Sequence, residues 1–189
     1  MIELEILVEI LSSYDKALDC LKKFDFIKES FTEDIYYIDP LRDTLQPKNL
    51  RLNASFRLRN QGDYSFITFK HDHFHGDKWL YSDENETEIG DFFVAQQILK
   101  QLGFEKMVVL KNLKRVYKHK SFEIVLEKVE KLGIFLEVEL KEEILESDVV
   151  SKKETIQNFI DSLGVSVSSE LNCGKPELYL RKFGHFKTI

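Results

Sequence analysis

Apolar and charged residues alternate along much of this chain, and this alternation limits the folds that it can adopt. The first segment is the clearest case: its apolar residues are Ile2, Leu4, Ile6, Val8 and Ile10, and the acidic residues between them are Glu3, Glu5 and Glu9. Side chains spaced by two residues along a β-strand lie on the same face. The segment therefore predicts a strand with one apolar face and one acidic face.

About eight segments share this two-residue period. We expect strands at residues 2–10, 34–39, 49–60, 64–70, 80–89, 106–119, 121–130 and 133–143, and helices at residues 12–26, 90–104, 151–164 and 176–184. Residues 71–79 are expected to form a loop. The apolar stripes of the helices must be covered, and the apolar strand faces are their natural partners. The charged strand faces are then left either to water or to one another.

Composition and charge exclude several classes of protein. The 189 residues and 22.3 kDa predict a single domain, residues 1–189, and the net charge of −6 argues against binding to nucleic acid. No segment is long and apolar enough to predict a membrane-spanning helix. Cys20 and Cys173 form neither a disulfide framework nor a metal-binding spacing, which favours a reducing, cytoplasmic location. The sequence allows a homodimer.

The charges on the polar faces are sorted by sign. Glutamates spaced by two residues occur on at least three segments, Arg57 and Arg59 lie on a fourth, and Thr68 and Lys70 lie on its neighbour. Carboxylates suit hard divalent cations such as Mg²⁺ or Mn²⁺, and arginine and lysine suit phosphate oxygens. A barrel with these faces inward would enclose a site for a metal–polyphosphate complex. A solvated or salt-bridged charged face is the simpler alternative from spacing alone.

The order of these pairs resembles the CYTH family, which contains class IV adenylyl cyclases and thiamine triphosphatases. The motifs of the family correspond here to "ELEIL", "RLR", "TFK", "ETE", "KNLKR" and "EVE", in that order and over almost the whole chain. The segment from "LGFEKMVVL" to "FLEVEL" is most similar to the class IV cyclase branch. The resemblance implies an α+β fold, in which an antiparallel eight-stranded β-barrel (the triphosphate tunnel) has a charged lumen and helices packed outside.

The resemblance also implies roles for individual residues. Its metal ligands would be Glu3, Glu5, Glu137 and Glu139, assisted by Glu86 and Glu88, with Mg²⁺ or Mn²⁺ as the cofactor. Its ligands for a triphosphate-containing small molecule would be Arg57, Arg59, Lys70, Lys111, Lys114 and Arg115, and the spacing does not decide which of the last three face the tunnel. The catalytic residues would be Glu3, Glu5 and Lys70.

Two positions depart from the pattern of the family. Leu7 stands where the first motif has a lysine, and Asn85 stands where the family often has an arginine. Loss of a well-placed cation lowers turnover by on the order of 10²–10³, so a catalytically weak nucleotide- or polyphosphate-binding module is one alternative. If Leu7 is the damaging departure, Leu7→Lys should raise turnover.

Two reactions fit such a site. In hydrolysis, water attacks the terminal phosphorus and orthophosphate leaves. In cyclisation, the 3′-hydroxyl of ATP attacks the α-phosphorus, and cyclic AMP and pyrophosphate form. We favour a triphosphatase, because hydrolysis does not need an adenine pocket. A barrel whose charges only pair with one another is the structural alternative.

The segment "HDHFH" offers a second candidate site. His71, His73 and His75 would share a face if the segment were extended, and imidazole suits Zn²⁺ or Cu²⁺. A polar loop near the barrel mouth is the simpler interpretation, because no further ligand is recognisable nearby. Trp79 and Tyr81 could stack on a base at the entrance or, more simply, pack against outer helices.

Overall fold

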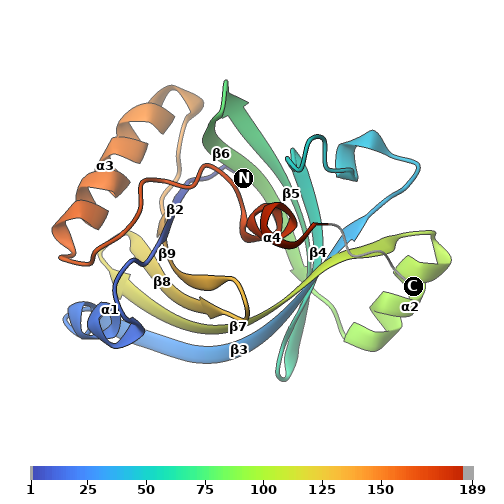
Figure 1. The fold of residues 1–189 in the computed structure, drawn as a ribbon, viewed down its shortest axis with the longest axis horizontal. Coiled ribbons are helices and arrows are strands. Elements are labelled where there is room, and N and C mark those ends of the chain that lie inside the picture. Colours follow the sequence, from blue (N-terminus) through green and yellow to red (C-terminus); the bar gives the residue numbers. More distant parts are fainter. Residues whose placement is uncertain (1, 185–189) are drawn as a thin grey trace.

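The computed structural model describes residues 2–184 and contains one antiparallel sheet that curves into a nearly closed barrel (Figure 1). Its strands are β1 (Ile2–Glu3), β2 (Glu5–Glu9), β3 (Asp25–Ile38), β4 (Ala54–Gln61), β5 (Tyr64–His75), β6 (Lys78–Glu88), β7 (Glu105–His119), β8 (Phe122–Val129) and β9 (Gly133–Leu140). The helices are α1 (Tyr14–Leu21), α2 (Phe92–Gln101), α3 (Val149–Ser162) and α4 (Lys175–Phe183). The predicted α+β barrel with outer helices is confirmed.

The N-terminal segment closes the barrel because its two halves pair with different edges of the sheet. The strand order is β1-β6-β5-β4-β3-β7-β8-β9-β2. Glu3 of β1 lies opposite Ser82 of β6, and Glu5 of β2 lies opposite Glu139 of β9. The partner changes at Leu4, so the first of the eight expected strands is divided and the count becomes nine. We call this closure the seam.

Several expected boundaries are wrong: β4 begins at Ala54 rather than near residue 49, and α1 ends at Leu21 rather than near residue 26. Strand β3 begins at Asp25 rather than near residue 34. The sequence pattern does not reveal its first half, because the residues there are mostly exposed and have no two-residue apolar period. It is held instead by its pairing with β7 along its length. Residues 71–79 do not form a loop. They continue β5 to His75 and reach β6 through a turn at Gly76, whose φ of 60° suits glycine.

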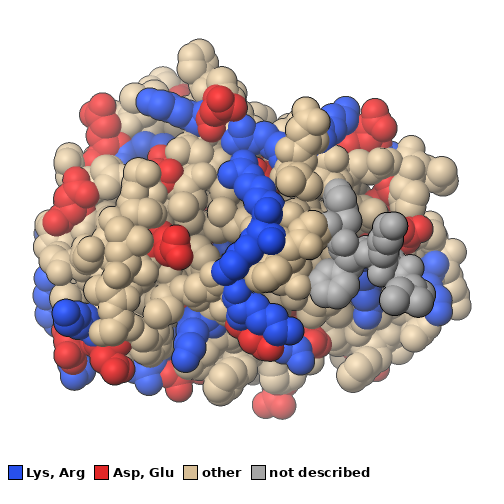
Figure 2. All heavy atoms as spheres, viewed as in Figure 1, with Lys and Arg blue, Asp and Glu red and all other residues tan. Residues whose placement is uncertain are grey.

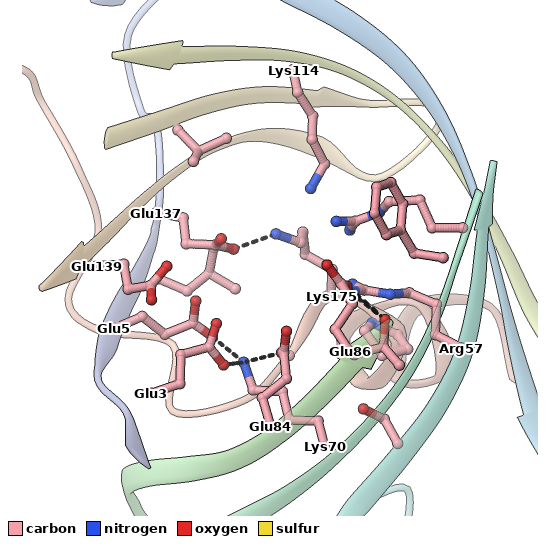
Figure 3. Close-up of a pocket in the computed structure, with 18 of the residues that line it drawn as sticks. Glu3, Glu5, Arg57, Lys70, Glu84, Glu86, Lys114, Glu137, Glu139 and Lys175 are labelled. Carbon is pink, nitrogen blue, oxygen red and sulfur yellow. Dashed lines mark hydrogen bonds and ion pairs between the residues drawn. The ribbon is translucent and has the colours of Figure 1, made fainter. Parts of the chain in front are cut away.

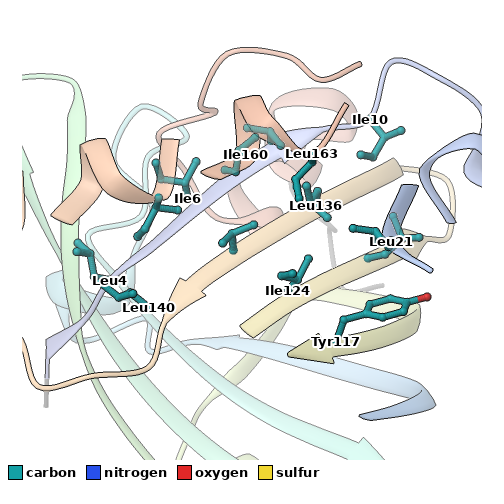
Figure 4. Packing of buried hydrophobic residues seen from close by; sticks show 14 of the residues in the cluster. Leu4, Ile6, Ile10, Leu21, Tyr117, Ile124, Leu136, Leu140, Ile160 and Leu163 are labelled. Atoms are coloured by element: carbon teal, nitrogen blue, oxygen red, sulfur yellow. The ribbon is translucent and has the colours of Figure 1, made fainter. Parts of the chain in front are cut away.

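The apolar strand faces form an outer core against α1 and α3. Leu4, Ile6 and Val8 are almost completely buried there, as the alternation predicts. They pack against Leu136 of β9 and Ile160 of α3 (Figure 4). Complete burial of such a side chain contributes roughly 1.5–3 kcal/mol. This packing fixes the faces of the N-terminal segment and so turns its glutamates inward.

Helix α2 covers the opposite side of the barrel, where Phe92 and Leu99 pack against Ile35 and Leu58. Its N-terminus is capped by Asp91, which accepts hydrogen bonds from two backbone amides. Helix α3 has Asp148 at its N-cap and so begins at Val149, before the expected start at residue 151. The helix faces therefore follow the sequence pattern more closely than the helix ends do.

Helix α4 closes one end of the barrel. Pro176 lies in its first turn and Gly184 at its C-cap, with a φ of 75°, as expected of these residues. Its Tyr179 and Leu180 belong to a buried cluster that also contains Leu7. A line of Lys and Arg side chains crosses the face on which α4 lies, but it is narrow and has acidic side chains beside it (Figure 2).

Both cysteines are free thiols, with Cys20 half-buried and Cys173 buried. Among residues 2–184, no helix is both long enough and apolar enough to cross a membrane.

Candidate functional site

The charged strand faces line a tunnel inside the barrel. The cavity has a volume of about 300 Å³, and its lining residues come from the strands and from the start of α4. Nine acidic and seven basic side chains line it. Because the acidic groups are in excess, a polyanion can enter favourably only together with cations.

One wall of the tunnel is acidic. Glu3 and Glu5 lie at the seam, and Glu137 and Glu139 lie on the adjacent strand β9 (Figure 3). The outer core turns the apolar residues on both sides of each glutamate away from the tunnel. All four carboxylates can therefore supply oxygen atoms to the same part of the tunnel, and oxygen is the donor that Mg²⁺ and Mn²⁺ prefer.

The Lys70 side chain reaches this acidic wall from β5. Its Nζ lies 2.5 Å from Glu3 Oε2, 2.7 Å from Glu5 Oε1 and 3.8 Å from Glu84 Oε2. Although burial acts to lower the pKa of Lys70, the carboxylates of Glu3 and Glu5 raise it well above its ordinary value. Lys70 is therefore a permanent cation among three carboxylates. Apart from its ion pair with Lys70, the buried Oε2 of Glu3 accepts no hydrogen bond from the described residues.

The two arginines of β4 lie on the opposite wall. Arg57 donates hydrogen bonds of 3.2 Å to Glu86 and to Thr68. Arg59 forms a two-point ion pair with Asp34, with distances of 2.7 and 3.0 Å. Burial raises the pKa of Asp34, but the nearby Arg59 outweighs that effect and holds the pKa well below its usual range. Asp34 thus fixes the position of Arg59 at the tunnel surface.

A third group of charges lies where α4 begins. Lys175 Nζ lies 2.7 Å from Glu127 Oε2 and 2.5 Å from Glu137 Oε2, and Lys114 also pairs with Glu127. Burial alone would lower the pKa of Lys175, but Glu127 and Glu137 raise it strongly. Glu137 has a lowered pKa because Lys175 and Lys114 together overcome the effect of its burial. This carboxylate is charged throughout the physiological range.

Two other carboxyl groups of the acidic wall, those of Glu5 and Glu139, have raised rather than lowered pKa values. Burial, with the nearby Glu137, raises the pKa of Glu5 to about 8 although Lys70 opposes the shift. Burial and Glu3 raise the pKa of Glu139 to about 8 although Lys141 opposes it. In the absence of a further cation, these two groups retain protons up to neutral pH.

The structure brings most of the predicted site residues together and leaves three out. The tunnel lining contains Glu3, Glu5, Arg57, Arg59, Lys70, Glu86, Lys114, Glu137 and Glu139. Glu88 is exposed beyond the tunnel. Lys111 and Arg115 lie on the outer face of β7, where they pair with Glu33 and Glu29. Even-numbered residues of this part of β7 face inward, so only Lys114 of the three basic candidates reaches the tunnel.

Several tunnel residues were missed by the sequence reasoning. Glu84 and Lys141 lie on the charged faces that the alternation predicts, two residues from Glu86 and Glu139, but the family motifs assign them no role. Lys175 has no such signal, because it belongs to a helix far along the chain from its two glutamate partners. The pattern of a single strand cannot predict such a contact.

The two departures from the family pattern have different structural consequences. Leu7 is only 2% exposed and packs in the cluster with Tyr179 and Leu180. Its cross-strand neighbour is Glu137, which holds the Lys175 ammonium. The ammonium of Lys175, from α4, thus lies beside the strand position at which the family has a lysine. Asn85 is exposed and lies between two residues that face the tunnel, so it points outward.

The histidine segment lies outside the tunnel. The ring of His73 stacks on Tyr81 with centroids 4.3 Å apart, and its Nε2 lies 2.9 Å from Asp83 Oδ2. Among the described residues, no three acidic, histidine or cysteine side chains converge as a ready metal site. Trp79 lines the tunnel rather than lying only against the outer helices. Its indole nitrogen donates a hydrogen bond of 3.1 Å to Ser82.

Comparisons with known proteins agree with this architecture. A family model of the CYTH domain matches residues 1–171. A protein of Methanocaldococcus jannaschii named "Putative adenylate cyclase" is 32% identical over 185 residues, which cover 96% of this chain and 99% of that protein.

Solved structures give the same fold. The PH1819 protein of Pyrococcus horikoshii has a TM-score of 0.78 and 24% identity, covering 94% of this chain and 99% of that chain. A Hippeastrum protein, described as a "putative adenylyl cyclase" with a dominant triphosphatase activity, has a TM-score of 0.66 and 16% identity, covering 95% of each chain. Since both identities are below 25%, these two likenesses concern the fold alone.

Proposed function

Because the chain belongs to the CYTH family, we propose that its tunnel binds a triphosphate-containing molecule together with Mg²⁺ or Mn²⁺ and hydrolyses it. The observation that carries this proposal is that one cavity gathers both carboxylates and basic side chains. Four carboxylates from the seam and β9 face a wall that presents Arg57 and Arg59. Carboxylates suit the cations, and guanidinium groups suit the phosphate oxygens.

The donor set fits divalent cations. Glu3, Glu5, Glu137 and Glu139 offer only oxygen atoms, and within residues 2–184 the buried Oε2 of Glu3 has no partner besides the Lys70 ammonium. These four residues would hold the cations, which would neutralise charge on the phosphate oxygens when bound. Arg57, Lys114 and Lys175 would bind and orient the phosphate groups, and Asp34 would keep Arg59 in position.

The proposed reaction is an in-line displacement at the terminal phosphorus. A bond forms from a water oxygen to phosphorus, and the bond from phosphorus to the bridging oxygen breaks. The bridging oxygen keeps the electron pair, and the proton lost by water passes to solvent or to a product oxygen. Charge neutralisation and orientation account for most of the catalysis of phosphoryl transfer, and the tunnel residues supply both.

Cyclisation of ATP is the second candidate, favoured by the name of the 32% identical relative. It would use the same charged groups, with the ribose 3′-hydroxyl as the attacking group in place of water. A binding module without turnover has less support than the sequence suggests, since Lys175 brings a cation to the neighbourhood of Leu7.

Product analysis distinguishes these functions. The full-length protein is incubated with tripolyphosphate, ATP or thiamine triphosphate and with Mg²⁺ or Mn²⁺, and the products are separated by ion-exchange chromatography. Release of orthophosphate that depends on the metal is the expected result. Cyclic AMP with pyrophosphate would identify a cyclase. Stabilisation by metal and tripolyphosphate without any product would identify a binding module.

The pKa values of the acidic wall predict how metal binding depends on pH. Glu5 and Glu139 have pKa values of about 8 in the folded protein, above the ordinary value of 4.5. Their contribution to stability is complete below the ordinary pKa and is lost as the pH rises through about 8. A divalent cation must displace the same protons. We therefore expect the rise in melting temperature caused by Mg²⁺ to grow between pH 6 and pH 9.

Differential scanning fluorimetry at several pH values, with and without Mg²⁺, measures this dependence. Glu139→Gln is the matched control, because it removes one titrating group and should flatten the pH dependence. An equal shift in melting temperature at pH 6 and pH 9 would contradict the prediction.

A further inference from the structure

Lys70 already occupies the place of a cation in the acidic wall. Its ammonium lies between Glu3, Glu5 and Glu84, with the closest oxygens at 2.5, 2.7 and 3.8 Å (Figure 3). Only 17% of the side chain is exposed, and the ring centroid of Trp79 lies 5.1 Å from Nζ. Strands β1, β2 and β6 thus form a cradle of three acidic side chains around the one positive charge that β5 supplies.

A divalent cation and this ammonium compete for the same oxygens. Mg²⁺ binds oxygen at about 2.0–2.1 Å and needs direct access to the lone pairs, which Lys70 now occupies on Glu3 and Glu5. Two cations within one cradle would also repel each other strongly in a partly buried site. As the carboxylates of the described residues now stand, no three of them converge as a metal site, so Glu3, Glu5 and Glu84 would have to draw together around a cation. Metal binding at Glu3 and Glu5 therefore requires Lys70 to leave.

The displaced Lys70 ammonium could contact a phosphate group bound beside Arg57. Lys70 shares its face of β5 with Thr68, which contacts Arg57 at 3.2 Å on the arginine wall. The lysine stem is flexible over four carbons, so Nζ can turn from the carboxylates toward a phosphate beside Arg57. Lys175 would not be displaced in the same way. If a cation bound Glu137, the Lys175 ammonium would still be paired with the buried Glu127.

We propose that Glu84 completes a cation site with Glu3 and Glu5, and that the Lys70 ammonium fills this site in the metal-free protein. A divalent cation that binds there displaces the ammonium, which then turns toward the triphosphate. This inference rests on the proposed function and deepens it. Metal binding converts Lys70 from a competitor of the metal into a ligand of the triphosphate, so the two ligands bind with positive coupling. Glu84 is a metal ligand in this scheme although it lies outside the glutamate pairs identified from the sequence.

The test is the affinity for Mn²⁺ alone, measured by electron paramagnetic resonance on the full chain without any triphosphate. Lys70→Met removes the competitor, and we expect it to bind Mn²⁺ at least about tenfold more tightly than the wild type. Lys28→Met is the matched control, because Lys28 lines the tunnel and its removal changes the tunnel charge by the same amount. It should change Mn²⁺ affinity much less than Lys70→Met does.

A second pair of variants keeps the test decisive if Lys70→Met does not fold. Glu84→Gln in the wild-type background should weaken Mn²⁺ binding, whereas Glu88→Gln, an exposed glutamate on the same strand, should not. Equal or weaker Mn²⁺ binding by folded Lys70→Met, or an unchanged affinity in Glu84→Gln, would overturn the inference. If the wild type meanwhile releases orthophosphate with Mn²⁺, the proposed function stands and only the inference fails. Absence of Mn²⁺ binding in all variants, with no metal-dependent turnover, would overturn both.

Discussion

Glu5→Gln is expected to lower triphosphate turnover by at least about 100-fold. Glu5 is a buried member of the acidic wall, and its carboxylate contacts the Lys70 ammonium at 2.7 Å. The amide has the same shape but carries no charge, so it is a poor ligand for a divalent cation. Because burial raises the pKa of Glu5 to about 8, a neutral group fits this position in the metal-free protein. The fold should therefore survive the change.

Glu9→Gln is the matched control for this variant. Glu9 lies on the same strand but is exposed and outside the tunnel, so its replacement should leave turnover within about twofold of the wild type. Rates are compared at saturating substrate and metal, and circular dichroism checks the fold. Equal turnover by Glu5→Gln and Glu9→Gln would remove Glu5 from the proposed chemistry.

Leu7→Lys is expected to lower the free energy of unfolding by about 3 kcal/mol. The sequence suggests that this change would raise turnover, whereas the burial of Leu7 predicts a loss of stability. Leu7 is 2% exposed, belongs to the cluster of Tyr179 and Leu180 and also lines the tunnel, so an ammonium there would lose this apolar packing and most of its hydration. The Lys175 ammonium already holds the neighbouring Glu137, so a second cation would also meet repulsion.

Urea denaturation of Leu7→Lys measures this loss, with Leu7→Met as the control. Methionine keeps the volume and the apolar character of leucine and should cost less than about 1.5 kcal/mol. An unchanged midpoint for Leu7→Lys, together with faster turnover, would show that position 7 tolerates an ammonium and that the missing lysine limits the rate.

The sequence predicts the barrel well because the outer core and the tunnel leave the same period in each strand. Leu4 and Ile6 are buried outside the barrel while Glu3 and Glu5 line its interior, so two-residue spacing reveals both faces. Strand β3 is recognised only in its second half, since its first half has neither face buried. Its extent depends on pairing with β7, which the pattern of a single segment does not record.

The site residues that the sequence does not predict also depend on contacts between distant segments. Lys114 and Lys111 differ only in which face of β7 they occupy, and the motif "KNLKR" contains residues from both faces. Lys175 reaches Glu127 and Glu137 from a helix, so its role depends on the packing of α4 across the barrel. Strand periodicity is local, whereas these contacts depend on how distant elements are placed.

The seam also has a consequence for how the protein folds. Glu3 pairs with Ser82 and Glu5 pairs with Glu139, so the seam segment obtains its partners only after β6 and β9, which follow it in the chain, have been synthesised. Such non-local pairing slows folding, because the entropy of closing long loops is lost before the contacts form. The acidic wall comes together in the same step that joins the two edges of the sheet. Partly folded chains would therefore hold no assembled acidic wall, and the proposed cation site would form only when the barrel closes.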